Sequence, residues 1–228
     1  MLTSRKMKLA EIFGFQIEFG YVSITRMSMD IVTTLRSSFM SGVFVGIAGF
    51  GYLATRDMVG SVLFAFALLG VVHYKTKLYT GAAGFITPRE LGQLALILFG
   101  NILGCLAVAL LARASAMPLQ EAAEQFLAKR LELGPLRGAL LAIGCGFIMT
   151  TAVTFARKGS YFPLLFGVPL FIVCGFPHCV ADAFYYLAAP LAYWQANLGS
   201  ILIFYVSIVL GNFVGCNFYR WVMGANPE

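Results

Sequence analysis

The chain has 228 residues, of which 60% are hydrophobic and only 11% charged, and its mean hydropathy is +0.84. A soluble domain carries about 25% charged residues, so this composition excludes a protein that covers itself with water-facing charge. The net charge of +6 could point to nucleic acid, but it also fits the excess of Lys and Arg in the cytoplasmic loops of membrane proteins. We therefore expect an integral protein of the lipid bilayer, without a nucleic-acid partner.

Six apolar segments follow one another, at about 35–55, 60–86, 91–112, 137–156, 160–191 and 195–222. A spanning helix needs about 20 mostly apolar residues, so the sequence predicts an all-α fold with six transmembrane helices. Residues 1–34 are amphipathic and charged, without the features of a cleaved signal peptide, and residues 223–228 form a short tail. The polar connection at about 113–136 predicts an external amphipathic helix.

The distribution of basic residues predicts the orientation. Six spans bring both ends of the chain to the same side of the membrane, and the connections on that side carry more Lys and Arg than those on the other. By the positive-inside rule, we expect both termini, and thus the amphipathic segment 1–34, to be cytoplasmic.

Two of the apolar segments are interrupted in a similar way. The second contains "HYKTKLYTGAAG" and the fifth "CGFPHCVADAF", and the segment after each carries a GNxxGC motif, in "FGNILGC" at 99–105 and "LGNFVGC" at 210–216. Three spans with the middle one broken, followed by three more, predict two inverted repeats, at about 35–112 and 137–222. Such repeats place a binding or permeation site near the midplane, between the breaks.

The breaks carry polar groups suited to an anion. Non-helical backbone inside a membrane is tolerated only where it is buried in protein or lines an aqueous cavity, and a half-helix N-terminus has partial positive charge. Thr80 offers a hydroxyl at the first break and His178 an imidazole at the second. A lone histidine often only packs, but ionisable groups inside membranes are functional candidates by default, and burial favours a neutral ring. Asp182, one helical turn later, could orient this ring or keep it charged.

Three basic side chains precede Thr80: His73, Lys75 and Lys77. They either line a vestibule in which the lysines reach water, or form an electrostatic funnel that concentrates anions. Both interpretations predict a basic entrance. They also leave open whether Lys77 and Asp182 form a buried pair, which would cancel both charges.

No motif indicates a cofactor or a metal. The five cysteines lie inside apolar segments and form no CxxC pair, so neither a zinc site nor a disulfide framework is expected. An intramembrane enzyme with a dyad of His178 and Asp182 would lack a paired nucleophile, and the chain has no HExxH or GxSxG motif. A structural scaffold would leave the two breaks unexplained. We therefore expect a transport protein and not an enzyme.

The segments "FAFALLGVVHYKTKLYTG", "CGFPHCVADAF" and "GNFVGC" resemble motifs of the formate/nitrite transporter family, over about residues 35–220. The resemblance implies an aquaporin-like six-helix protomer in a homopentamer of the bacterial inner membrane. Each protomer would have its own pore for small monovalent anions such as formate, nitrite or hydrosulfide, sometimes moved with a proton.

The resemblance also implies roles for individual residues. Thr80 would lie in the break loop and His178 at the centre of the pore, between two hydrophobic constrictions. Phe64 and Leu68 would belong to one constriction, and Leu78 and Phe171 to the other.

The chain departs from the family pattern at charged positions. Lys77 stands where the family has an acidic residue, Pro177 where it has Glu, and Asp182 where it has Asn. The expected function is passage of a small monovalent anion, formate first, with protonation on the way. The alternative is a channel for a small neutral solute on the same fold.

Overall fold

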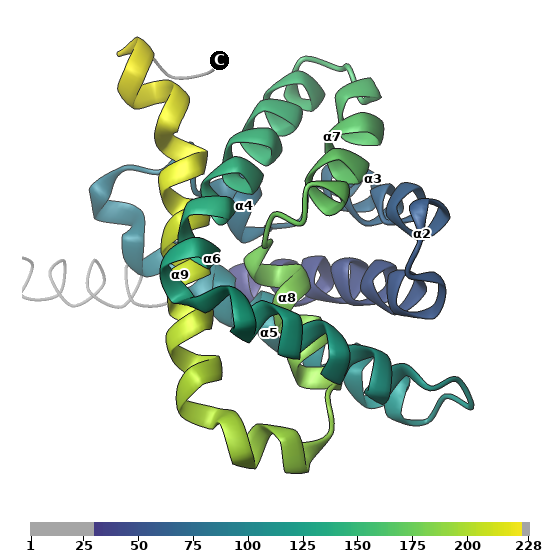
Figure 1. Cartoon of the computed structure of the whole chain (residues 1–228). Helices are drawn as coiled ribbons and strands as arrows, with labels where there is room; N and C mark the ends of the chain where they lie inside the picture. Colours follow the sequence, from purple (N-terminus) through teal and green to yellow (C-terminus); the bar gives the residue numbers. More distant parts are fainter. Residues whose placement is uncertain (1–29, 225–228) are drawn as a thin grey trace, which may run out of the picture.

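The computed structural model describes residues 30–224, and all regular structure in this range is helical (Figure 1). The elements, in chain order, are a first helix at Asp30–Thr55 and then α2 (Met58–Leu63), α3 (Ala65–His73), α4 (Tyr79–Ala82), η1 (Pro88–Glu90), α5 (Leu91–Arg113), α6 (Leu119–Arg157), α7 (Phe162–Val173), α8 (Cys179–Ala188) and α9 (Leu191–Met223).

Four helices are long and apolar enough to cross a membrane: Asp30–Thr55, Pro88–Arg113, α6 and α9. The remaining apolar helices are shorter, namely Met58–His73, α7 and α8. The predicted all-α membrane fold is confirmed, and the protein is an integral membrane protein. Of the predicted terminal segments, residues 1–29 and 225–228 lie outside the described residues, and residues 30–34 begin the first helix.

The helices α3 and α7 end in turns of the same kind. Lys75 after α3 and Gly175 after α7 both adopt the left-handed region, with φ of 53° and 68°. The N–H groups of Thr76 and Phe176 then each donate to the carbonyl five residues earlier, at 3.0 and 2.9 Å. This conformation suits glycine and costs other residues about 1–2 kcal/mol. The turn therefore ends each helix before its break, and at the first break it does so with a lysine.

Asn101 of α5 holds the first break in place. Its Oδ1 accepts the Tyr79 N–H at the start of α4 (2.9 Å), and its Nδ2 donates to the Lys77 carbonyl (3.0 Å) and to the Ser38 carbonyl of the first helix (2.8 Å). Asn101 is fully buried. One side chain thus bonds three backbone groups, two of them at the break itself, where the chain supplies no helical partners.

Asn212 of α9 makes the equivalent three bonds at the second break. Its Oδ1 accepts the Cys179 N–H at the start of α8 (2.8 Å), and its Nδ2 donates to the carbonyls of Pro177 (2.9 Å) and Ala142 of α6 (2.8 Å). Asn101 and Asn212 are the asparagines of the two GNxxGC motifs. Their matching roles support the predicted repeat.

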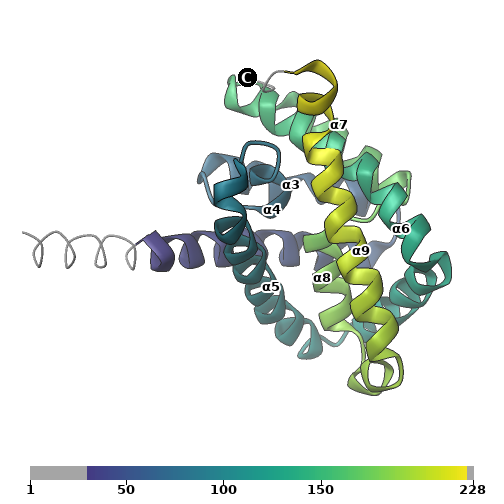
Figure 2. The ribbon, with the colours of Figure 1, turned by 90° about the vertical axis from the view of Figure 1, so that its left-hand side faces the viewer.

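The glycines of the same motifs allow close helix packing. A Cβ atom on Gly104 of α5 would lie 2.1 Å from the Phe39 carbonyl oxygen of the first helix, and one on Gly215 of α9 would lie 2.0 Å from the Ile143 carbonyl oxygen of α6. No side chain fits at such distances. As a result α9 runs directly along α6, as Figure 2 shows, and the asparagines reach across the contact.

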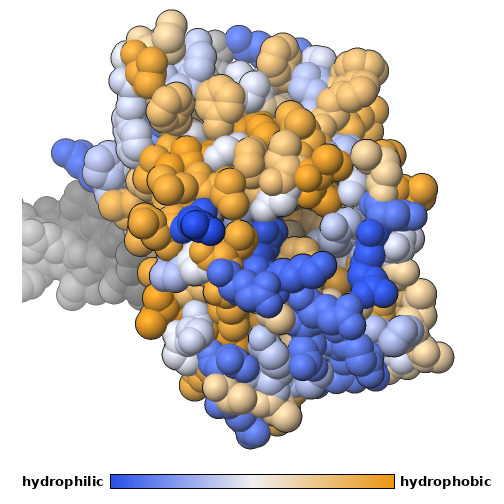
Figure 3. All heavy atoms as spheres, in the orientation of Figure 1, coloured by the Kyte–Doolittle hydropathy of each residue, from blue (hydrophilic) through white to orange (hydrophobic). Residues whose placement is uncertain are grey.

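The polar connection is helical from Leu119, as predicted, but it is less external than expected. The helix α6 contains a non-helical residue, Gly134 (φ 72°, ψ 158°), which divides it into residues 119–133 and 135–157. In the first part Leu119, Ala123, Leu127 and Arg130 are buried along one face, while the other face forms part of a hydrophilic patch (Figure 3). One face of the amphipathic helix therefore packs against the rest of the protein, and the other face is exposed.

We predict that Asn101→Ala and Asn212→Ala each destabilise the protein by at least about 2 kcal/mol, because a buried unpaired polar group costs about 1–3 kcal/mol. Thermal unfolding in detergent would measure the change. Asn197→Ala is the matched control, since Asn197 bonds only to the Tyr193 carbonyl of its own helix. Equal melting temperatures for all three variants would show that the asparagines do not hold the breaks.

Candidate functional site

The two breaks bring Thr80 and His178 into contact. Thr80 lies in α4, and His178 is the N-cap residue of α8. The distance from Thr80 Oγ1 to His178 Nε2 is 2.9 Å, and both residues are buried, with 0% and 1% of their surface exposed. The residues that the sequence singled out as polar groups of two separate breaks therefore form one site.

The neighbours of His178 define where its proton lies. Nδ1 accepts the N–H of Ala181 (3.1 Å), so it carries no hydrogen. The neutral ring therefore has its proton on Nε2, and this N–H donates to Thr80 Oγ1. The Thr80 hydroxyl hydrogen remains free to donate to a further group. The site thus offers a hydroxyl donor whose oxygen is itself held by an imidazole.

A cavity of about 330 Å³ adjoins the α7–α8 break. We call it the Arg130 cavity, after the arginine of α6 that lines it together with Lys129, Asp182, Phe171 and Cys174. The ring of Phe171 stacks on that of His178, with centroids 5.5 Å apart. Phe171 therefore lies between this cavity and the buried histidine.

A second cavity, of about 540 Å³, adjoins the α3–α4 break. We call it the Lys77 cavity; its lining includes Lys75, Lys77, Leu78, Gly81 and Arg157. Leu78 and Gly81 flank the buried Thr80 in sequence. The Thr80–His178 contact is thus approached from one break through the Arg130 cavity and from the other through the Lys77 cavity.

The structure groups the four constriction residues differently from the prediction. Phe64 pairs edge-on with Phe171, with centroids 6.3 Å apart and planes at 85°, although the prediction placed them in different constrictions. Leu78 lines the Lys77 cavity and Phe171 the Arg130 cavity, so these two face different cavities. The reason is that each break turns the chain back, so that the residues before one break meet those before the other. Leu68, one turn after Phe64, is also buried.

Asp182 has other partners than the predicted ones. Its Oδ2 accepts the backbone N–H of His178 (3.0 Å), and its Oδ1 accepts from Arg130 Nε (2.9 Å) and from the Tyr186 hydroxyl (3.0 Å). It does not touch the imidazole, because that ring turns toward Thr80. The hypothesis that Asp182 orients the ring is therefore wrong; Asp182 fixes the backbone at His178 instead.

Arg130 is the residue that sequence reasoning missed. It forms a salt bridge with Asp182 and also donates from Nη1 to the Gly175 carbonyl (2.6 Å), so it ties α6 to the second break. The signal was present in the amphipathic pattern, because Arg130 shares the buried face of Ala123 and Leu127 at helical spacing. A charge on that face needs a partner, and Asp182 is that partner.

The predicted basic entrance is split between two places. Lys77 Nζ donates to Thr34 Oγ1 of the first helix (2.7 Å), so Lys77 and Asp182 do not pair. Lys75 is exposed and, like Lys77, lines the Lys77 cavity. His73 is exposed as well, but it lines a separate shallow pocket with Tyr74 and Tyr161. The two lysines, and not His73, therefore stand at the approach to Thr80.

The cysteines, all within the described range, are unpaired. Cys105 Sγ contacts the Val180 carbonyl (3.3 Å) and Cys216 Sγ the Thr80 carbonyl (3.4 Å), so each motif cysteine packs on the break of the other repeat. Cys174 is exposed, although it lies inside an apolar segment of the sequence; the other four are buried.

The model of the formate/nitrite transporter family matches residues 19–223. The chain belongs to this family. No curated protein matches the chain. Two solved structures are similar to it: a pentameric formate channel with formate bound (20% identity, 86% of this chain and 98% of the other, TM-score 0.72) and an FNT family ion channel (19%, 89% and 94%, TM-score 0.74). At these identities the likeness shows that this chain shares their fold.

For this member of the formate/nitrite transporter family, we predict that Asp182→Ala lowers the free energy of unfolding by about 3–5 kcal/mol, because it leaves the buried Arg130 without its counter-ion. Denaturant unfolding in detergent would measure the loss. Asp57→Ala is the matched control, since Asp57 is an exposed cap that accepts the Gly60 N–H, worth about 1 kcal/mol. If Asp182→Ala cost no more than Asp57→Ala, the salt bridge would not support the break.

Proposed function

We propose that this protein is a membrane channel or transporter for small monovalent anions, with formate as the first candidate. The observation that carries the proposal is the contact between Thr80 and His178, which is buried between two cavities lined by cationic side chains. Membership of the family and the similarity to a pentameric formate channel with formate bound support it.

The cavities would attract the anion. Lys75, Lys77 and Arg157 line one, and Lys129 and Arg130 line the other. A cleft lined by one sign of charge, with low-dielectric walls, raises the local concentration of the opposite ion. An anion would therefore gather mainly in the Lys77 cavity. In the Arg130 cavity Asp182 offsets the charge of Arg130, and Lys129 supplies the remaining attraction.

The centre would let the solute pass in neutral form. Phe64, Leu68, Leu78 and Phe171 are all buried and would remove the water shell of the solute. A bare charge there is costly, but a weak acid such as formate avoids most of that cost once it takes up a proton. The Thr80 hydroxyl, whose oxygen His178 holds, would donate a hydrogen bond to the solute, and His178, or water that it orders, would help this transfer.

An intramembrane enzyme finds less support. The dyad that the sequence allowed needs the His178 ring to contact Asp182, whereas that carboxylate binds the His178 backbone N–H, Arg130 and Tyr186. The ring contacts a threonine hydroxyl instead.

The assembly proposed is a homopentamer in the bacterial inner membrane, with both termini cytoplasmic. Large apolar side chains are exposed on the helices, among them Leu136, Leu191 and Val222, and Figure 3 shows a broad hydrophobic surface. Lipid or neighbouring protomers would cover such a surface. The similarity to a pentameric channel supports the number of copies.

The test is flux into proteoliposomes that contain the purified protein, with formate, nitrite, hydrosulfide, bicarbonate, chloride and urea compared across pH 5–8. We expect formate or nitrite flux well above that of protein-free liposomes, and rising as the pH falls, because a larger fraction is then protonated. Urea flux without any anion flux would contradict the proposal and favour a channel for neutral solutes.

A matched pair of variants locates the path in the same assay. Thr80→Val keeps the shape but removes the hydroxyl, and we expect formate flux to fall about tenfold, which corresponds to the loss of one hydrogen bond of about 1.4 kcal/mol. Thr151→Val is the control, since the half-buried Thr151 donates to the Phe147 carbonyl of its own helix and lines neither cavity. Equal fluxes would place the path away from Thr80.

A further inference from the structure

The first break holds a lysine where the equivalent position of the second break holds a glycine. Lys75 and Gly175 occupy matching left-handed positions in the two turns. A lysine is strained in this conformation, and a glycine is not. Residues held in unfavourable backbone regions gather at functional sites, where the side chain matters more than the strain. Lys75 is exposed and lines the Lys77 cavity. What a lysine adds here, and a glycine would not, is a positive charge at this cavity.

The Lys77 cavity is richer in uncompensated charge than the Arg130 cavity. Lys75 and Lys77 line it, and none of the described acidic residues does. The ammonium group of Lys77 contacts the neutral hydroxyl of Thr34. In the Arg130 cavity, by contrast, Arg130 is paired with Asp182. The two lysines alone therefore bring more positive charge than one monovalent anion would neutralise.

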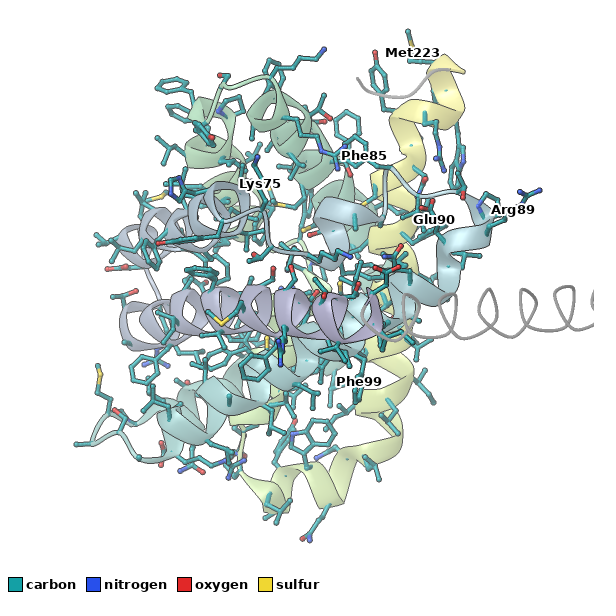
Figure 4. The ribbon with its side chains drawn as sticks, turned by 180° about the vertical axis from the view of Figure 1, so that it is seen from behind. Lys75, Phe85, Arg89, Glu90, Phe99 and Met223 are labelled. Carbon is teal, nitrogen blue, oxygen red and sulfur yellow. The ribbon has the colours of Figure 1, made fainter. Side chains whose placement is uncertain are left out.

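We propose that the Lys77 cavity binds a compact divalent oxyanion from solution, of the sulfate or hydrogenphosphate class, with its charges on Lys75 and Lys77. The cavity of about 540 Å³ has room for such an ion, and Thr76 and Tyr161 in its lining supply polar neighbours. Figure 4 shows Lys75 at the α3–α4 break.

The bound oxyanion does not pass. Leu78 closes the cavity toward Thr80 and is buried, and sulfate, unlike formate, stays doubly charged at the pH of the cell, so it cannot avoid the cost of entering the apolar centre. While bound, it occupies the approach to Thr80. Divalent oxyanions therefore compete with the permeant anion at this side; the block rests on the proposed function, but the binding does not.

Binding is tested first without transport. Thermal unfolding of the purified full chain in a neutral detergent is followed while sodium sulfate replaces sodium gluconate at constant ionic strength. A ligand that binds the folded state at ten times its dissociation constant raises the melting temperature of a domain of this size by about 3–6 °C. We expect this rise for the wild type and its loss in Lys75→Gly/Lys77→Gln.

The control variant removes two cations outside the cavity. Arg89 in η1 points outward in Figure 4, and Lys158 follows α6; both are exposed, and neither lines the Lys77 cavity. The variant Arg89→Gln/Lys158→Gln should keep the full sulfate shift. A shift that is absent from the wild type, or lost equally in both double variants, overturns the binding site.

The block is tested by formate flux into proteoliposomes of neutral lipid, with sulfate or gluconate at equal ionic strength on both sides of the membrane. We expect sulfate to inhibit the wild type and the control variant alike, and its half-inhibiting concentration to rise at least tenfold in Lys75→Gly/Lys77→Gln. Sulfate no more inhibitory than gluconate would overturn the block. Absence of any formate flux would contradict the proposed function and leave the sulfate shift in detergent to decide the site.

Discussion

The structure depends on one constraint: a membrane-buried backbone must find all its hydrogen-bond partners within the protein. Two helices end inside the apolar region, and Asn101 and Asn212 satisfy the backbone groups that these ends release. Because each asparagine lies on the neighbouring glycine-rich helix, the helix packing and the breaks specify one another. The contact between Thr80 and His178 follows from both breaks being held at this depth.

Much of this could be read from the sequence, because the signals are local. Polar and glycine residues within apolar runs marked both breaks, and the repeated GNxxGC motif marked the helices that hold them. Thr80 and His178 stood out for the same reason. Periodicity places Arg130 on a buried face, but it does not say which group Arg130 meets. Its pairing with Asp182 and that of Phe64 with Phe171 depend on how segments distant in the sequence fold against each other.

The two ends of the path differ in charge although their backbones are alike. At the second break Arg130 and Asp182 form a pair that binds both the Gly175 carbonyl and the His178 N–H. The charges of these two side chains therefore stabilise the backbone of the break. At the first break the lysine side chains face a cavity without a described acidic partner. One end is therefore built for rigidity, and the other for attraction of anions.

The central claim is that the solute passes the Thr80–His178 contact and takes up a proton there. It is tested most directly by formate flux through His178→Phe in proteoliposomes across pH 5–8, compared with the wild type. The account predicts a slower flux whose dependence on pH is weakened, because phenylalanine fills the space of the imidazole but cannot donate or order a proton. A flux of unchanged rate and unchanged pH dependence would contradict it.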